Sequence, residues 1–298
     1  MNMTIKSEIS KELSYRLKII NVIMIILVIF IHSYRTEIKY EGEIIGLVVP
    51  KFLEILKRII SRRISISAVP LFFLISSFLL FSKEIDFRKN LVKKSKTLLI
   101  PYLFWNTFWI ILYFIAQNIS FTKSFFSNPN TIIRNFGTRD FLYAYIGNLS
   151  AGSSEPFLFT LWFIRDLMIL NIFCLLIKKI IDKYALFVLV GSFCFWFFDI
   201  NFYIVTATSL LFFVLGYFIV KYNLQIEMID NIKYRYIIPV YIFAVAFSML
   251  NHPVISNIFY KATVIIGICF FIKLSRNIYL NNKFREFFLK LDYATLFL

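Results

Sequence analysis

The sequence is dominated by apolar runs long enough to cross a bilayer, which takes about 20 residues as a helix. With 59% hydrophobic residues and a mean hydropathy of +0.75, the 298-residue chain is too apolar for a water-soluble globule. It predicts an all-α, polytopic transmembrane bundle of about nine or ten spans. We expect one membrane domain, 1–298, with an incomplete last span. The predicted spans are Leu17–Tyr34, Ile64–Phe81, Leu98–Ile119, Phe157–Ile177, Ala185–Phe198, Phe202–Val220, Tyr236–Leu250, Ile258–Ile272 and Phe287–Leu298.

The basic residues alternate in density from one predicted loop to the next. With the N-terminus in the cytoplasm, twenty of the 33 Lys and Arg residues fall on the inner side and ten on the outer side. This bias predicts a multi-pass protein of the inner (cytoplasmic) membrane with a cytoplasmic N-terminus. The outer segment 35–63 departs from the rule because it holds seven of those ten residues. Within it, Ile44–Ile60 mixes charged and apolar residues and is predicted to be an amphipathic helix at the interface.

Composition excludes several classes of function. All three cysteines lie inside apolar blocks, which excludes a disulfide framework and a cysteine-pair zinc site. No glycine-rich phosphate loop, serine-nucleophile elbow or metal-ligand spacing occurs in the sequence. We therefore expect no bound metal or cofactor. The net charge of +16 is explained by the bilayer, so we expect no nucleic-acid partner, and the sequence does not indicate an oligomeric state.

A few polar residues lie within the apolar runs, where each needs a partner, a cavity or a function. His32 near the end of the first run is either an interfacial histidine with a structural hydrogen bond or a general base. Arg165 and Asp166 lie mid-span and are expected to face the bundle interior. Adjacent helix positions point about 100° apart, so the two need not pair. They either form a structural polar knot, or Arg165 holds an anionic group while Asp166 orients a neighbour.

The densest basic run lies in the inside loop before the third predicted span. Its usual meaning is an anchor against anionic lipid. Lys93 and Lys96 are three residues apart and share a helix face, so they could also hold a diphosphate.

Five segments in order carry a resemblance to a known family. They are INVIMIILVIFIHSY, VPLFFLISSFLLF, KKSKTLLIPYLFWN, LWFIRDLMILN and LLFFVLGYFI, which together span residues 15 to about 220. In this order they resemble the acyltransferase-3 family of integral membrane enzymes that O-acetylate surface polysaccharides. The resemblance implies transfer of an acyl group, most often acetyl, from acyl-CoA to a hydroxyl of a surface glycan or a lipid-linked glycan precursor.

The resemblance also assigns roles to residues. His32 corresponds to the family's essential histidine. Lys93 and Lys96 fall where relatives have basic residues that meet the acyl-CoA donor, and Asn21 stands where many relatives carry a donor-side arginine. Acetyl-CoA is thus expected as co-substrate. Trp162 and Ser76 belong to the matching segments and, with Arg165 and Asp166, are candidates for substrate contact or a structural polar core.

Two other functions stay open. A membrane carrier or flippase of an anionic or lipid-linked solute would suit Arg165, Asp166 and Lys261, although the span prolines Pro70, Pro101 and Pro239 form no matching halves. An inactive family member within a glycan-assembly complex would suit Asn21 and the short last span.

Overall fold

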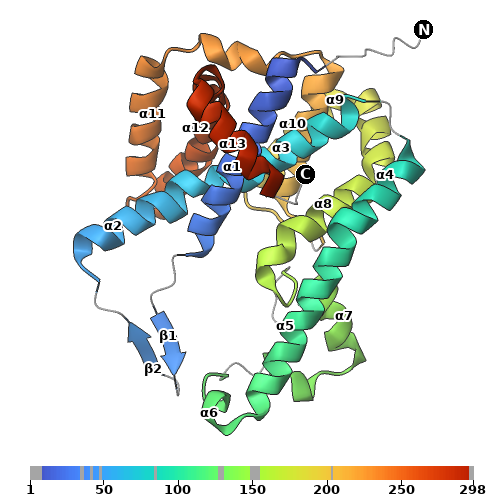
Figure 1. Cartoon of the computed structure of the whole chain (residues 1–298), viewed down its shortest axis with the longest axis vertical. Coiled ribbons are helices and arrows are strands. Elements are labelled where there is room, and N and C mark those ends of the chain that lie inside the picture. Colours follow the sequence, from blue (N-terminus) through green and yellow to red (C-terminus); the bar gives the residue numbers. More distant parts are fainter. Residues whose placement is uncertain are drawn as a thin grey trace.

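The computed structural model describes residues 9–33, 37–40, 43–46, 49–83, 86–126, 131–147, 155–202 and 204–294. This part of the chain is helical apart from one antiparallel two-stranded hairpin of β1 (Glu37–Tyr40) and β2 (Glu43–Gly46). The long helices form a bundle from which the hairpin projects (Figure 1). We call the end of the bundle with the hairpin the hairpin end, and the other, where the first helix begins, the opposite end.

The first half of the chain contains two long helical segments that change geometry along their length. Helix α1 (Lys11–His32) is followed, after the hairpin, by α2 (Lys51–Ile59), the π-helical turn η1 (Ile60–Ile64), the 3-10 turn η2 (Ser65–Ser67) and α3 (Ala68–Phe81) in one run. A second run joins α4 (Phe87–Lys94), the π-helical turn η3 (Ser95–Leu99) and α5 (Ile100–Asn118). The predicted amphipathic helix therefore starts later than expected: residues 43–46 are a strand, and the helix begins at Lys51 as the start of a longer segment.

The remaining elements follow in chain order. They are α6 (Ser120–Lys123), η5 (Ile133–Asn135), α7 (Thr138–Ile146), η7 (Phe159–Leu161), α8 (Trp162–Ile172), α9 (Cys174–Phe197), α10 (Ala207–Lys221), η8 (Ile226–Asn231), α11 (Tyr234–Phe247), α12 (Pro253–Leu280) and α13 (Asn282–Ala294).

Five helical segments are long and apolar enough to cross a membrane, counted over the described ranges. They are Lys11–His32, Lys51–Phe81, Phe87–Asn118, Cys174–Phe197 and Pro253–Leu280, with shorter apolar helices at Ala207–Lys221 and Tyr234–Phe247. Each predicted span coincides with at least part of a helix.

The polypeptide reverses direction at Tyr184, inside α9. Tyr184 has non-helical φ and ψ angles of −129° and 43°. Before it, Asp166 contacts the start of α10 and Asp182 contacts Tyr217 near its end; after it, Asn201 again bonds the start of α10, at Ala207. Residues 178–183, within the segment 178–184 expected as a loop, are therefore helical, and the turn is made at Tyr184. The run Cys174–Phe197 is thus two shorter apolar helices and not one straight span.

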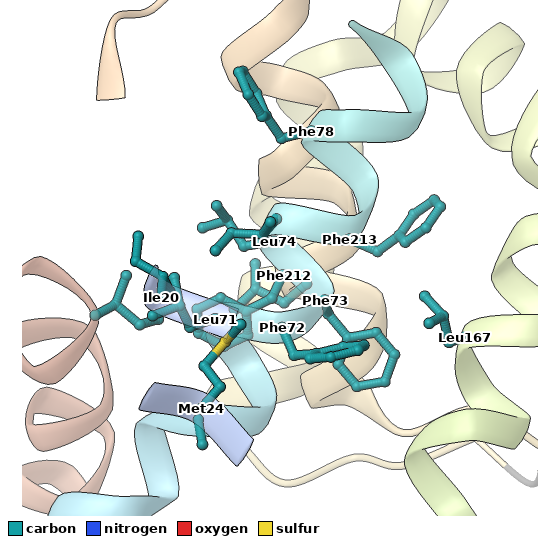
Figure 2. Close-up of a cluster of buried hydrophobic side chains, with 14 of the residues drawn as sticks. Ile20, Met24, Leu71, Phe72, Phe73, Leu74, Phe78, Leu167, Phe212 and Phe213 are labelled. Atoms are coloured by element: carbon teal, nitrogen blue, oxygen red, sulfur yellow. The ribbon is translucent and has the colours of Figure 1, made fainter. Parts of the chain in front are cut away.

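The centre of the bundle is built on α3 and α10. Figure 2 shows α3 side chains meeting Ile20 and Met24 of α1, Phe212 and Phe213 of α10, and Leu167 of α8. Lipid is as apolar as these side chains, so close packing and small residues, rather than escape from water, drive helix association. At Gly216 a Cβ atom would overlap the Leu74 carbonyl oxygen and lie 2.6 Å from Ser77 Cβ, which shows how closely α3 and α10 approach.

The outer helices expose their apolar side chains. Helices α5, α9 and α11 leave long rows of Phe, Leu, Ile, Val and Trp residues uncovered. A water-soluble surface does not carry apolar patches of this extent, whereas a lipid-facing surface does.

Candidate active site

His32 is the last residue of α1, at the hairpin end. Ser10 caps the start of this helix by accepting a hydrogen bond from the Leu13 amide at 3.0 Å, and the helix ends where the Ser33 amide bonds the Ile29 carbonyl. The His32 ring is exposed and meets the edge of Phe159, with ring centroids 5.8 Å apart. No hydrogen bond joins the ring to another described residue, so its nitrogens are available to a substrate hydroxyl.

Asn21 lies eleven residues before His32, on nearly the same face of α1. The two are roughly 16 Å apart along the helix axis, with Asn21 nearer the N-terminus. The side chain is buried, and its Nδ2 donates to Asp292 Oδ1 at 3.3 Å. Lys18 lies 3.9 Å from the other oxygen of Asp292. Asn21 is thus part of the polar contact between α1 and α13.

Lys93 lies on α4 and Lys96 on η3, and Figure 1 shows α4 on the side of the bundle away from the hairpin. Lys93 is in the last turn of α4 and Lys96 in η3, so the wider π-helical turn begins between them. Both side chains are exposed, whereas Lys94 between them is partly buried. The structure therefore presents the two lysines to solvent or headgroups, and no hydrogen bond or ring contact among the described residues joins either of them to His32.

Arg165 and Asp166 form a closed ionic cluster, which we call the Arg165 knot. Although adjacent on α8, the two side chains do pair: Arg165 Nη2 and Nε donate to Asp166 Oδ1 at 2.7 and 3.1 Å. The second oxygen of the completely buried Asp166 accepts from the Thr206 amide at 2.9 Å and from Ser209 Oγ at 2.7 Å. Arg165 Nη1 donates to the Ile146 carbonyl at 2.7 Å. The knot therefore ties α7, α8 and the start of α10 together, a geometry typical of a structural polar core.

Trp162 and Ser76 lie on the contact between α3 and α8. The Trp162 ring is 6.4 Å from the Phe73 ring, and Phe72 meets Phe163 edge-on at 5.8 Å. Ser76 is one helical turn further along α3, buried, and its Oγ has no partner among the described residues. Trp162 directly follows the turn η7 that contains Phe159.

Two residues that the sequence did not single out hold this segment in place. Asn106 of α5 is fully buried, and its Nδ2 donates to the Ala144 carbonyl at 2.8 Å while its Oδ1 accepts from the Leu158 amide at 2.9 Å. The Tyr102 hydroxyl donates to the Tyr145 carbonyl. Because Leu158 directly precedes Phe159, Asn106 is a positioning residue for the surroundings of His32. A buried amide at the end of the KKSKTLLIPYLFWN segment is the signal that could have found it.

A second ionic cluster lies at the opposite end, which we call the Arg16 knot. Arg16 is 1% exposed and donates to both oxygens of Asp230, at 2.7 and 3.0 Å, as well as to the Ile272 carbonyl and Ser275 Oγ. The adjoining cavity of about 10 Å³ has room for about one water molecule. The sequence predicts Arg16 to lie on the cytoplasmic side, before the first span, and the structure places it inside the bundle.

Lys261, the third charge considered for a carrier, is also neutralised within the protein. Its Nζ forms an ion pair with Asp199 and lies 4.9 Å from the Trp196 ring. Over the described ranges, no group of three His, Cys, Asp or Glu side chains lies close enough to hold a metal ion.

A family model for an acyltransferase domain, acyltransferase-3, matches residues 15–291, nearly the whole chain. The chain belongs to the acyltransferase-3 family. No curated protein and no solved structure matches it. Membership implies a membrane acyltransferase in general terms, in agreement with the apolar helices.

Proposed function

We propose that this acyltransferase-3 protein transfers an acyl group, acetyl in the main reaction, from acyl-CoA to a hydroxyl of a cell-surface glycan or its lipid-linked precursor. The observation that carries the proposal is the family match over residues 15–291 together with an accessible His32 at the end of α1. The chain has one other histidine, His252, and its Nδ1 accepts a hydrogen bond from the Ile255 amide at the start of α12.

His32 acts as general base in the proposed reaction. Its neutral imidazole takes the proton of the acceptor hydroxyl as the oxygen attacks the thioester carbonyl. The tetrahedral intermediate then collapses, the carbon–sulfur bond breaks, and the proton passes to the departing CoA thiolate. The products are the O-acyl glycan and free CoA. Phe159 packs on the ring and restricts its orientation.

The two ends of the bundle have different roles in this proposal. We place the N-terminus and the α4–η3 segment on the cytoplasmic side of the inner membrane, as the Lys and Arg distribution favours, with about nine or ten crossings. Lys93 and Lys96 then meet the donor's phosphates where acyl-CoA is made. His32 lies at the outer end of α1, a helix whose 22 residues span about 33 Å. The acyl group, or the donor's pantetheine arm, must therefore reach well into the bundle, and Asn21 lies part-way along that path.

Arg165, Asp166, Trp162 and Ser76 are assigned a supporting role. The Arg165 knot uses both oxygens of Asp166 within the protein, so we assign it to holding α7, α8 and α10 in register. Trp162 and Ser76 fill the space behind the Phe159 segment.

The test compares strains that lack the gene and are complemented with wild type, His32→Ala or His252→Ala. Mass spectrometry of the surface glycan reports O-acetylation, and release of free CoA from labelled acetyl-CoA by the purified protein reports turnover. We expect His32→Ala to abolish both signals and His252→Ala to keep both. Undiminished acetylation in a well-expressed His32→Ala strain would overturn the catalytic assignment.

The same assays separate the two alternatives. A carrier would neither hydrolyse acetyl-CoA nor pass its label to a glycan. An inactive family member would be silent in both assays as wild type, yet its deletion would still disturb glycan assembly. The carrier gains no support from Arg165, Asp166 and Lys261, because each of them is paired with a described protein group of opposite charge.

A further inference from the structure

Three arginines cluster where α2 passes into η1, at the hairpin end. Arg58 is in the last turn of α2, and Arg62 and Arg63 are in η1. Arg62 directly precedes Arg63 in the chain, and Arg58 lies four residues before Arg62. Single π-helical turns inside α-helices occur frequently at functional sites, because the extra residue redirects the side chains around it.

Arg63 is held by neutral groups. Its Nη2 donates to the Ser248 carbonyl at 2.7 Å, its Nη1 donates to the Arg62 carbonyl at 3.0 Å, and the guanidinium carbon lies 5.8 Å from the centroid of the Tyr260 ring. Its Nε is buried and has no acceptor among the described residues. No carboxylate whose side chain the structure describes forms an ion pair with Arg63.

The surroundings leave this arginine in an excess of positive charge. Lys261 lies 5.9 Å from the same Tyr260 ring, but Asp199 neutralises it. The nearest acid on α2, Glu54, is exposed and lies 3.8 Å from Arg58. A partly desolvated guanidinium with no carboxylate partner among the described side chains is unfavourable, and its planar set of donors matches the oxygens of a phosphate.

The position of α2 indicates at what depth in the membrane a phosphate would meet these arginines. The segment Lys51–Phe81 has 31 residues and would be about 46 Å long as a straight helix, longer than a 30 Å hydrocarbon core. Helix α2 has no buried residue and exposes Phe52, Leu53, Ile55 and Leu56 beside its basic residues. This composition is typical of a helix at the headgroup boundary, where the phosphates of membrane-anchored molecules lie.

We propose that Arg58, Arg62 and Arg63 bind the phosphate group of a membrane-anchored molecule. Resting on the function proposed above, that molecule is the glycan acceptor linked to its lipid through a diphosphate. Segments η1 and η2 pack against α1, whose C-terminal residue is His32. An acceptor held by its phosphate at this site therefore presents its sugar at the end of the bundle where His32 lies.

The binding test uses the full chain in phosphatidylcholine nanodiscs and a fluorescent farnesyl diphosphate analogue as probe. We expect unlabelled farnesyl diphosphate to displace the probe and farnesol to leave it bound. Arg63→Gln should raise the Kd at least tenfold, and Arg58→Gln or Arg62→Gln three- to fivefold. Lys57→Gln, a neighbouring basic residue of α2, should change it less than twofold. Arg63→Lys, which retains the charge, tests the site if Arg63→Gln does not fold.

The result that overturns the site is an equal Kd for wild type and the folded Arg63 variants, or displacement by farnesol as strong as by the diphosphate. Inorganic diphosphate and phosphatidylglycerol serve as further competitors. If phosphatidylglycerol displaces the probe as well as farnesyl diphosphate does, the phosphate site stands and its assignment to the acceptor is wrong. His32→Ala should bind the probe normally. Probe binding by a wild type without acyltransferase activity would therefore overturn the proposed function and leave the phosphate site in place.

Discussion

The Arg165 knot and His32 differ in burial and in the number of hydrogen bonds that their polar atoms form within the protein. In the knot, both oxygens of Asp166 bond protein groups and the side chain is completely buried. The His32 ring is exposed at the end of a helix, meets the edge of Phe159 and forms no hydrogen bond with a described residue. A saturated buried cluster stabilises a fold and has little capacity left for a ligand, whereas an accessible imidazole can exchange a proton. The difference suggests that stability and reactivity are located in separate parts of this bundle.

The largest expected effect is on the knot. Replacing Asp166 with Ala leaves Arg165 buried without its carboxylate, and removing one partner of a buried pair costs roughly 3–5 kcal/mol. We expect a large loss of folded protein in membranes and a lower thermal midpoint in detergent. Glu54→Ala is the control, because its ion pair with Arg58 joins two exposed side chains and is worth about 1 kcal/mol or less. Equal stability of the two variants would break the comparison.

The next effect concerns packing rather than charge. Gly216→Ala places a methyl group against the Leu74 carbonyl and Ser77, and such overpacking costs about 1–3 kcal/mol. Gly191→Ala is the control, because a Cβ there meets nothing within 4 Å. Thermal unfolding in detergent should show a clear loss for the first variant and little change, or a small gain, for the second. Similar midpoints would show that the α3–α10 contact can relax.

A smaller effect is expected at the exposed lysines. Lys93→Gln or Lys96→Gln removes one solvent-screened charge, worth about 1 kcal/mol, so the KM for acyl-CoA should rise about fivefold. The rise should shrink with added salt, and kcat should not change. Lys123→Gln, an exposed lysine on α6 at the hairpin end, should leave the KM unchanged. A kcat effect at Lys93 would contradict a role confined to donor binding.

The smallest effect on stability is expected at His32 itself. Because the ring is exposed and bonds no described residue, His32→Ala should change the free energy of unfolding by about 0.5 kcal/mol or less. The thermal midpoint should therefore match wild type while acyl transfer is lost. A midpoint as low as that of Asp166→Ala would make His32 a structural residue and remove the contrast.

Much of the architecture follows from one-dimensional properties of the chain. Apolar runs such as Leu98–Ile119 predict helices because lipid leaves a backbone no other partner for its amides and carbonyls. The ordered segments around IHSY, LIPY and LWF also predict the family, which the match over residues 15–291 confirms. The sequence predicts the boundaries of the elements less well. The hairpin formed by β1 and β2 and the single-residue turn at Tyr184 depend on local backbone geometry that hydropathy does not encode.

The pairing of polar groups was decided only by the tertiary structure. The sequence shows that Arg165 and Asp166 lie in an apolar span. It does not show that the Thr206 amide and the Ser209 hydroxyl, about 40 residues further along the chain, donate hydrogen bonds to the Asp166 carboxylate. It places Arg16 in a loop, whereas Asp230 pairs with it in the interior. An amide in an apolar run marks Asn106 as a residue that needs a partner, but the sequence does not show that this partner is the segment beside His32. Hydropathy reports how much of the chain leaves water, and it is a sum over residues. Which charge meets which partner depends on how helices distant in sequence are packed, and that is a property of their arrangement in space.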